Sequence, residues 1–357
     1  MDTKKIFSLK SKIIIIIGFN LILLFVLIYL VSTFFLLKSF KNIEQDLTIQ
    51  RVQRASDAIV DIVNQLSIKT TDWAWWDDTY KFINDKNKAY IESNLGVGSI
   101  SNLKINTMVY VNANEDIIFK KMIDFKNKKE LSSESIGEHI NTHKILSLPN
   151  AESKVQGVIL LPEGLMIIAA LPILTSDGEG PVLGTILFGK FLDNDIISEI
   201  GKLIRLPLSI YLYDNPSLPL DVITAKSKLS QDETIFINPL TKTLIAGYTI
   251  VNDVYNKPLF ILKIETPREI YNQGQFTLYS FMAIASLLII LFGIILILLL
   301  ERLVIFRLSL LGKDIDKIST TQDLSFRVKE GEKDEIGKLA IVINRMLEAL
   351  YLSKKTE

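Results

Sequence analysis

Two long runs of apolar residues divide the chain, one near each terminus. The first extends from Ile13 to Leu37 and the second from Leu278 to Leu300, and aliphatic and aromatic residues dominate both. At about 1.5 Å per helical residue the second run reaches about 34 Å, whereas the hydrocarbon core of a bilayer is about 30 Å thick. We therefore predict two transmembrane helices.

Basic residues before the first run set the expected orientation. They are Lys4, Lys5, Lys10 and Lys12, and such lysines stay in the cytoplasm. A cleaved signal peptide would have an apolar region of about 7 to 15 residues that ends in small residues, whereas this run is longer and ends in Phe and Leu before Lys38. We expect a retained anchor in the cytoplasmic membrane, surrounded by lipid, with both chain termini inside the cell.

These spans predict how the chain is divided. The expected segments are a cytoplasmic N-terminus (1–12), a first membrane helix (13–37), an extracytoplasmic domain (38–277), a second membrane helix (278–300), a cytoplasmic domain (301–354) and a tail (355–357). No glycine or proline interrupts the start of the outer domain, where apolar residues recur at spacings of three and four. They predict a long stalk helix (38–70) with a narrow seam made of Val52, Ala55, Ile59, Ile62 and Leu66. Such a seam packs either against a second copy or against the body of its own domain.

Short β-rich runs separated by turn residues begin after Asn106. Five form a first group: Thr107–Val111, Asp116–Met122, Val155–Leu160, Leu165–Leu174 and Val182–Phe191. After an expected helix at Asp193–Leu203, four form a second group: Leu208–Tyr213, Thr234–Ile237, Thr243–Val251 and Leu259–Ile264. The pattern indicates antiparallel strands in two sheet modules, which is an α+β fold. We expect Lys126–Thr142 to be a loop or a marginal helix, and a helix capped by Thr266 to lead into the second span.

Composition excludes several classes of function. Lys and Arg number 40, as do Asp and Glu, so the formal net charge is zero and no basic stripe favours nucleic acid. The chain has no cysteine for disulfides or thiolate chemistry. The sequence contains no recognisable Ser, His and Asp arrangement, so we expect neither catalytic residues nor a cofactor. His139 and His143, the only histidines, have a spacing that suits metal ligands, but their polar surroundings favour a solvated loop without a metal.

The densest chemical signal is the aromatic motif, Asp72–Tyr80, which holds all three tryptophans of the chain beside three carboxylates. If the motif is helical, one face carries Trp73, Trp76, Asp77 and Tyr80. Rings beside carboxylates are able to surround a cationic amine, since cation–π attraction contributes about 0.5 to 2 kcal/mol per ring. The alternative is that the rings pack the stalk onto the first sheet while the carboxylates bond backbone groups.

The sequence Asp-Trp-Ala-Trp-Trp-Asp-Asp-Thr-Tyr, placed after a membrane-proximal helix, resembles the CHASE4 sensory domains. The resemblance covers about residues 39 to 200 and extends more loosely through Ala246–Tyr248 and Pro267–Tyr271. It implies a Cache- or PAS-like extracytoplasmic sensor of the kind attached to histidine kinases and nucleotide cyclases. It also implies a ligand, which is a small molecule or a periplasmic protein. If the aromatic motif contacts this ligand, the candidate residues are Trp73, Trp76, Asp77, Asp78 and Tyr80.

Two heptad stripes follow the second apolar run. The first consists of Leu308, Leu311, Ile315 and Ile318, and the second of Ile336, Leu339, Ile343, Met346 and Leu350. Each predicts a coiled-coil helix. Between them lies a polar connector with two isolated apolar residues, Leu324 and Val328, which we expect to pin it against the helices.

The second of these helices opens with Asp334-Glu335-Ile336-Gly337, whose carboxylates suit the positive end of a helix dipole. Together with the two stripes, this sequence resembles the HAMP domain, the parallel four-helix linker of dimeric membrane receptors, over about residues 302–354. Arg307 departs from the pattern, since many members have proline there. One copy supplies two of the four helices, so the resemblance implies a homodimer whose stripe, connector and motif residues relay the signal.

Few residues follow the second stripe, and no histidine occurs after His143. We therefore expect no phosphoacceptor in this chain, which is either a receptor without its own output or the input part of a longer one. We interpret it as a transmembrane receptor that relays an extracytoplasmic stimulus to a partner such as a histidine kinase or cyclase. The alternative function is a coupling subunit that docks a periplasmic protein and regulates a separately encoded kinase or cyclase.

Overall fold

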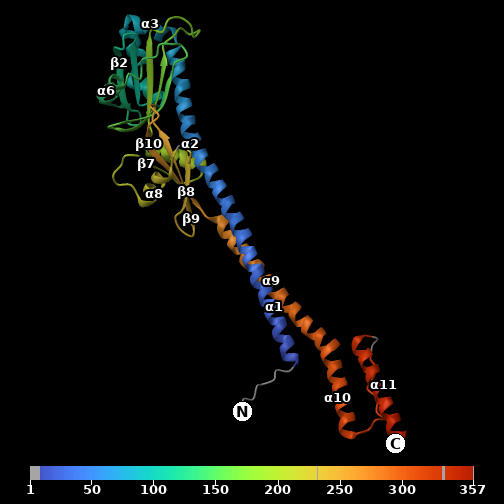
Figure 1. Cartoon of the computed structure of the whole chain (residues 1–357). Coiled ribbons are helices and arrows are strands. Elements are labelled where there is room, and N and C mark those ends of the chain that lie inside the picture. Colours follow the sequence, from blue (N-terminus) through green and yellow to red (C-terminus); the bar gives the residue numbers. More distant parts are fainter. Residues whose placement is uncertain (1–8, 231, 332–333, 357) are drawn as a thin grey trace. The chain divides into compact units, whose positions relative to one another are not determined.

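The computed structural model describes residues 9–230, 232–331 and 334–356. They form two compact units: a central unit, Lys41–Asn272, and a helical unit made of the segments before and after it. Figure 1 labels the helices and strands of both units. Of the lysines predicted to be cytoplasmic, Lys4 and Lys5 lie outside the described residues.

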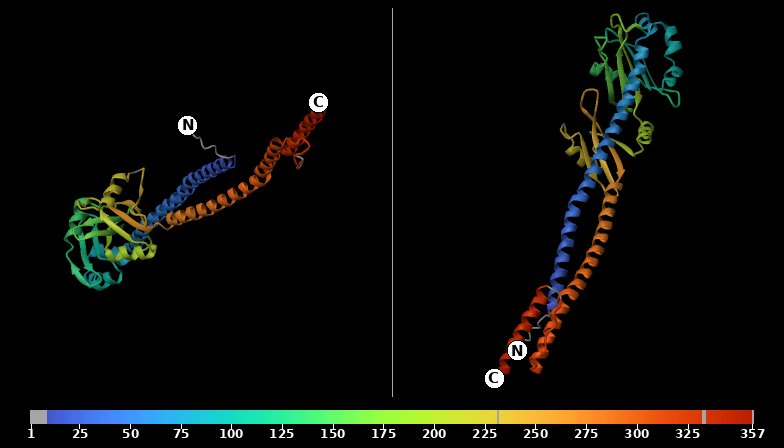
Figure 2. Two further views of the ribbon diagram at one scale, coloured as in Figure 1. Left: turned by 90° about the horizontal axis from the view of Figure 1, so that it is seen from below. Right: turned by 90° about the vertical axis from the view of Figure 1, so that its right-hand side faces the viewer.

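The long helix α2, Lys38–Ala74, corresponds to the predicted stalk. Its seam is buried in the core of the central unit, where Val52, Ala55, Ile59 and Leu66 are at most 3% exposed. Both sheets of the unit lie along this helix (Figure 1 and Figure 2). The seam therefore packs against the body of its own chain, which is one of the two interpretations that the sequence left open.

The first module is a six-stranded antiparallel sheet with the order β3-β2-β1-β6-β5-β4. Its strands are β1 (Thr107–Asn112), β2 (Ile117–Asp124), β3 (Lys129–Leu131), β4 (Val155–Leu161), β5 (Gly164–Pro172) and β6 (Gly184–Phe191). Alternation along β1 places Met108 and Tyr110 in the core that contains the seam of α2, and Val109 and Val111 in a second core. Both faces of this sheet are therefore buried.

Helices cover both faces of the first sheet. On the side of α2, they are α3 (Asp77–Asp85), α4 (Lys88–Asn94) and α5 (Val97–Asn102). On the other side, α6 (Glu134–His143) buries Ile136 and Ile140. The sequence predicted a loop or a marginal helix there and did not predict β3. Two apolar residues four apart in a polar run are too few to show a helical period, and only their contacts with the sheet reveal their role.

The second module is a four-stranded antiparallel sheet with the order β7-β10-β9-β8. Its strands are β7 (Leu208–Leu212), β8 (Ile235–Pro239), β9 (Leu244–Asn252) and β10 (Pro258–Pro267). The helix α7 (Asn194–Ile204) connects the modules as predicted, whereas α8 (Leu220–Lys228), which packs on this sheet, was not predicted. At Gly247 of β9 a Cβ would lie 2.5 Å from Val52 Cγ2, so glycine permits the close approach of α2.

The end of β10 corrects the predicted start of the next helix. Thr266 and Pro267 pair with Ile245 and Leu244 of β9, so the strand continues through both residues. Thr266 is buried in the sheet and does not cap the helix. The helix α9 begins at Glu269 and runs to Leu300. A Thr-Pro pair is compatible with a cap or with a strand end, and the ladder with β9 decides between them.

The helical unit contains two helices that are long and apolar enough to cross a membrane, judged by length and composition. They are α1 (Leu9–Ser32) and α9, and one π-helical turn follows each, η1 (Thr33–Leu37) and η2 (Glu301–Ile305). At Gly293 of α9 a Cβ would lie 2.6 Å from Leu21 Cδ1 of α1. A glycine at this point lets the two helices approach closely, as small residues do between membrane helices.

Two further helices follow η2, as the heptad stripes predicted: α10 (Phe306–Thr321) and α11 (Glu335–Thr356). Their shared core consists of Leu311, Ile318, Val328, Ala340 and Leu347, with Leu324 packed against it. Both apolar residues of the connector therefore contact the helices, as predicted. Asn344 adds a polar anchor, because its side chain donates to Val328 O at 3.0 Å and accepts from Val328 N at 2.9 Å.

Candidate functional site

The aromatic motif is not one helix, which corrects the predicted helical face. The helix α2 ends at Ala74 and α3 begins at Asp77. Between them Trp76 has an extended backbone, with φ −119° and ψ 127°, and occupies the N-cap position of α3. Trp73 and Tyr80 therefore belong to different helices, and the turn between these helices brings the rings together.

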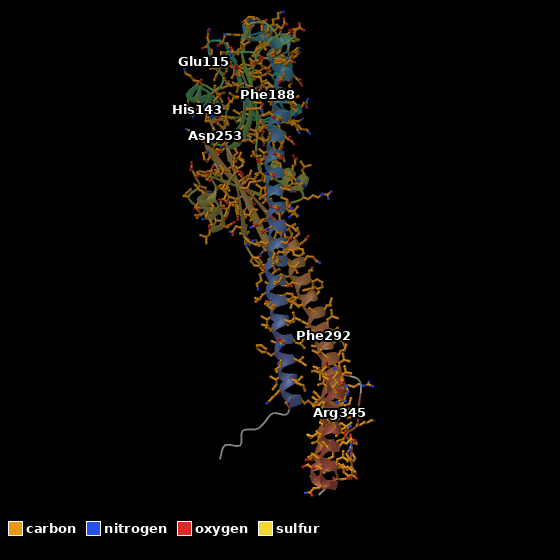
Figure 3. All side chains as sticks on the ribbon, turned by 45° about the vertical axis from the view of Figure 1, so that its right-hand side comes forward. Glu115, His143, Phe188, Asp253, Phe292 and Arg345 are labelled. Carbon is orange, nitrogen blue, oxygen red and sulfur yellow. The ribbon has the colours of Figure 1, made fainter. Side chains whose placement is uncertain are left out.

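Two of the three tryptophans pack against the first sheet. The rings of Trp73 and Trp76 meet edge to face with their centroids 5.8 Å apart. Trp73 also lies 5.9 Å from Phe188 of β6, which Figure 3 labels, and Trp76 lies 5.8 Å from Tyr90 of α4. Such aromatic pairs contribute about 0.5 to 1.5 kcal/mol beyond the burial of their area. Both rings therefore have a packing role.

Asp77 and Tyr80 hold the loop between β5 and β6. The Asp77 carboxylate accepts from Ser176 N at 2.9 Å, and Asp77 N donates to Ser176 Oγ at 3.2 Å. The Tyr80 hydroxyl donates to Pro181 O at 3.3 Å. These bonds fix the position of the loop relative to α3, which is the backbone-bonding role that the sequence left open for the motif's carboxylates.

A chain of three hydroxyl groups runs from the motif into the sheet. Thr79 Oγ1 lies 2.6 Å from the Tyr90 hydroxyl, which lies 3.4 Å from the Tyr110 hydroxyl. Burial raises the pKa of Tyr110 well above that of an exposed tyrosine, and it raises the pKa of Tyr90 as well. Both phenols therefore stay protonated at neutral pH. Phe82 stacks on Tyr90 with a centroid distance of 4.5 Å and fixes the orientation of its ring.

A cleft of about 230 Å³ opens beside these hydroxyls, between α3 and α4. Its lining consists of Asp78, Lys81, Phe82, Asp85, Asn87, Ala89, Tyr90, Ser93 and Asn94. Of the predicted ligand-contact residues, Asp78 lines this cleft. Asp85 is held in place, since its Oδ1 accepts from Asn87 N at 3.0 Å.

The cleft suits a small cation better than an anion. Asp78 and Asp85 provide two carboxylates and Lys81 provides one ammonium group, which leaves one excess negative charge. Tyr90 adds an aromatic ring and a hydroxyl group. Within the residues that the structure describes, no group of three His, Cys, Asp or Glu side chains is arranged to hold a metal ion.

The sequence did not single out Tyr90, Asp85 or Lys81 for this site. One signal was present, because the Asn87 side chain accepts from Ala89 N at 2.8 Å and caps α4. An asparagine cap directly after α3 predicts a tight connection between two short helices. Such a connection places Tyr90 next to α3.

A buried ion pair links the first part of α2 to the end of β10. Arg268 donates to Glu44 Oε2 from both Nε, at 3.1 Å, and Nη2, at 2.9 Å. Glu44 is 4% exposed and Arg268 is 9% exposed. The guanidinium also lies over Tyr271, 4.1 Å from the ring centroid. Because Arg268 stands between β10 and α9, the pair connects the two chain segments through which the central unit joins the apolar helices.

Comparisons with known proteins give a family match inside the central unit and a relative that aligns with most of the chain. Residues 58–211 match the family model of the CHASE4 domain, and this range includes the aromatic motif, the cleft and the first sheet. The methanogenesis regulatory histidine kinase FilI of Methanothrix harundinacea is 25% identical over 335 residues, which are 92% of this chain and 37% of the relative. The chain thus spans little more than a third of the length of this relative.

Solved sensor domains show remote likeness to the chain. The periplasmic domain of Vibrio cholerae LuxQ has a TM-score of 0.39 and 11% identity, over 62% of this chain and 99% of that one. The ligand-binding domain of the Campylobacter jejuni chemoreceptor Tlp3, in complex with L-valine, has a TM-score of 0.42 and 12% identity, over 67% of this chain and 98% of that one.

The family match and the curated relative support the class that the motif predicted. The match to the CHASE4 model covers residues 58–211, and the relative with which most of the chain aligns is a histidine kinase.

Proposed function

We propose that the chain is the sensory input of a two-pass receptor in the cytoplasmic membrane. The central unit lies outside the cytoplasm, the apolar parts of α1 and α9 span the bilayer, and both termini lie inside. The observation that carries this proposal is a CHASE4 domain placed between two helices that are able to cross a membrane. A stimulus bound outside changes the position of α9 and so reaches the cytoplasm.

The proposed ligand site is the cleft between α3 and α4 together with the aromatic motif. Asp78 supplies the charge partner for a small organic cation, and Trp73 and Trp76 support the helices that form the walls. Asp77 and Tyr80 act indirectly, since they keep the β5–β6 loop against the motif. An amine fits the excess negative charge and gains about 0.5 to 2 kcal/mol from each ring that faces it.

The proposed relay is a HAMP-type homodimer formed by α10, the connector and α11. In a single chain, Leu339, Met346 and Leu350 of the predicted stripe are 46%, 56% and 50% exposed. A second copy covers them in a four-helix arrangement, because each chain supplies two helices. The other proposed relay residues are Leu308, Leu311, Ile315, Ile318, Leu324, Val328, Glu335, Ile336 and Ile343.

Arg307, which departs from the HAMP pattern, contacts the Asp334–Gly337 motif on which the resemblance to that pattern rests. Arg307 forms an ion pair with Asp334, and the same carboxylate accepts from Gly337 N at 2.8 Å. The hydrogen bond from Arg307 lowers the pKa of Asp334, so the carboxylate stays charged. We propose that this pair fixes the angle at which α10 meets the start of α11.

The output partner is a histidine kinase or a cyclase. Either further residues of a longer receptor or a separate protein supplies it. A histidine kinase is favoured, because the curated relative is named as one and this chain aligns with 37% of it.

Thermal unfolding of the full chain in lipid nanodiscs tests the ligand site. A panel of amines, amino acids and organic acids is added, since a ligand at about 100 times its dissociation constant stabilises by about 2.7 kcal/mol. We expect an amine to raise the unfolding temperature, and Asp78→Asn to remove this shift without altering the unliganded protein. Asp72→Asn is the matched control, because Asp72 is an exposed carboxylate of the same motif outside the cleft. An amine shift that survives Asp78→Asn would contradict the site.

Disulfide formation tests the homodimer, because the chain has no cysteine of its own. We expect Met346→Cys to form covalent dimers in nanodiscs under mild oxidation, while Arg345→Cys, one position along the helix, forms few. A full-length protein that is monomeric in mild detergent would contradict the dimer. A periplasmic protein that co-purifies with the chain, in the absence of any ligand shift, would favour the coupling-subunit function.

A further inference from the structure

The tip of the β9–β10 hairpin connects the second module to the outer strand of the first. Val254 N donates to Val158 O of β4 at 3.2 Å. The Val254 side chain lies on Gly157, where φ is +150° and a Cβ would be 3.0 Å from Val254 Cγ1. Val254 and Tyr255 also pack against the core on the α6 side of the first sheet. The tip is thus held against the first module by a backbone hydrogen bond and by the packing of these two side chains.

Both histidines of the chain meet this hairpin from α6. The rings of His139 and His143 stack with centroids 4.5 Å apart and planes inclined by 14°. His143 stacks in turn on Tyr255 at 4.9 Å, and His139 Nε2 lies 3.0 Å from the Tyr255 hydroxyl. Figure 3 labels His143 and Asp253 in this region. The segment that the sequence suggested to be a solvated loop is therefore a helix with an aromatic interface.

The hydrogen bonds of the stack depend on protonation. With His139 neutral at Nε2, the Tyr255 hydroxyl donates to this nitrogen, and a proton on Nε2 reverses the bond. His143 Nδ1 donates to His139 O at 3.2 Å, which leaves Nε2 of that ring for a second proton. Protonation of both rings places two positive charges face to face at the stacking distance, and like charges at this distance repel.

The elements around the stack carry several titratable groups. The hairpin has Asp253, Tyr255 and Lys257, α6 has Glu134 and Glu138, and β2 has Lys120, which pairs with Glu134 at 3.0 Å. The strand β4 has no titratable side chain. Burial and the neighbouring His143 lower the pKa of His139, although Asp253 acts in the opposite direction. Burial raises the pKa of Tyr255 to about 12, so the phenol stays neutral in the range where His139 takes up a proton.

We propose that His139, His143 and Tyr255 form a proton-operated latch between the two modules. With neutral rings, the stack and the Tyr255 hydrogen bond hold the hairpin tip on α6 and β4. Protonation of the two histidines reverses that bond, and the two positively charged rings repel each other. The hairpin tip is then released.

Acid therefore weakens the latch. A histidine whose pKa is lower in the docked state takes up its proton more readily once the hairpin is released. Its contribution to docking is complete above the pKa of a free histidine, about 6.5, and is lost as the pH falls below this value toward the lowered pKa. Release is thus expected in mildly acidic surroundings.

The release has a direct path to the rest of the receptor. The tip joins β9 to β10, and β10 ends at Pro267, two residues before α9 begins. The pH outside the cell thus acts on the strand that precedes α9 without any ligand in the cleft. This inference does not depend on the identity of that ligand.

Hydrogen–deuterium exchange of the full chain in nanodiscs tests the latch. Exchange is measured at pH 7.5 and 5.5 and corrected for the intrinsic effect of pH on amide exchange. We expect protection of the peptide that contains Val254 to fall at least about fivefold at pH 5.5, which is the lower end of typical coupling between sites. Peptides from β1 should keep their protection at both values.

The double variant His139→Gln/His143→Gln has no histidine left and is the decisive control. We expect its Val254 peptide to show the same protection at both pH values. His143→Gln alone serves if the double variant fails to fold, because His143 is exposed, and it should reduce the pH effect. The latch is overturned if the wild type shows no loss of protection, or if the histidine-free protein shows the same loss, which would assign it to carboxylates.

Discussion

The two modules of the central unit differ in how deeply their sheets are buried. In the first module, β5 has an unbroken buried stretch from Met166 to Pro172, and cores lie on both of its faces. In the second module, β7 and β8 contain no buried residue. Elements with few buried contacts open at lower free energy. The proposed ligand site thus stands on a stiff frame, whereas the edge strands of the sheet that precedes α9 have fewer buried contacts to hold them.

The largest expected effect comes from a methyl group inside the stiff frame. At Gly184 of β6 a Cβ would lie 2.1 Å from Val111 O, a backbone atom that no side-chain movement can clear. We expect Gly184→Ala to destabilise the first module by more than about 4 kcal/mol. All three tryptophans belong to this module, so their fluorescence during urea unfolding measures it.

The matched variant in the second module is Gly247→Ala. There the new Cβ meets Val52 Cγ2, the end of a side chain that is able to rotate, so we expect a loss of about 1 to 3 kcal/mol. Equal losses for the two variants would contradict the difference between the modules.

After Gly184→Ala, the next largest effect is expected at the buried ion pair near the start of α2. Glu44→Ala leaves Arg268 buried without its partner, and we expect a loss of about 3 to 5 kcal/mol in thermal unfolding followed by circular dichroism. The double variant Glu44→Leu/Arg268→Met should recover most of this loss, since it removes both charges. Glu269→Ala, on an exposed neighbour, is the control. If Glu44→Ala is as stable as the wild type, the ion pair does not stabilise the second module.

Asp221 offers a way to weaken the second module by pH. Its carboxylate accepts from the Tyr248 hydroxyl at 2.6 Å and from Lys263 Nζ at 2.8 Å. Burial raises the pKa of Asp221, but the hydrogen bonds from Lys263 and Tyr248 outweigh it and lower this pKa. The stabilisation is therefore present above the pKa of a free aspartate, about 3.9, and is lost as the pH falls below it.

Acid titration should accordingly unfold the second module first, seen as a loss of circular dichroism before the tryptophan signal changes. Asp221→Asn should cost about 1.5 to 3 kcal/mol at pH 7 and flatten this acid dependence. Coincident transitions in the wild type would mean that the modules unfold as one.

Sequence patterns predicted the strands well and the contacts poorly. Runs such as Met166–Pro172 are apolar because both faces are buried, and their boundaries are visible in the turn residues around them. The break inside the aromatic motif was not visible, because spacings of three and four among the rings favoured a continuous helix. The contact beside the break joins Asp77 to Ser176, which are 99 positions apart.

The candidate site was predicted in part for the same reason. Asp78 was named from the motif, but Tyr90 reaches the cleft only through the turn between α3 and α4. Arg268 and Glu44 are 224 positions apart, and neither belongs to a motif that reveals a pair. The stripe on α11 was predicted from its period. Only the fold shows that Ala340 and Leu347 form the core with α10, while Leu339 and Met346 are exposed.

The smallest expected effect comes from the rim of the first module. Glu115, labelled in Figure 3, lies 3.8 Å from Lys144, and both side chains are largely exposed. We expect Glu115→Gln to change stability by less than about 0.5 kcal/mol in thermal unfolding, because water and salt screen such a pair. A loss above about 1 kcal/mol would mean that this edge contributes to the stiffness of the frame.

The position of β10 has a mechanical consequence. It has strand neighbours on both sides, β7 and β9, and the ladder bonds of antiparallel strands lie perpendicular to the strands. A force that enters β10 along its axis at Pro267 therefore loads the bonds of both ladders in shear, all at once, and does not peel them open one by one. The three strands therefore resist the force together, and a pull on β10 displaces β7 and β9 with it.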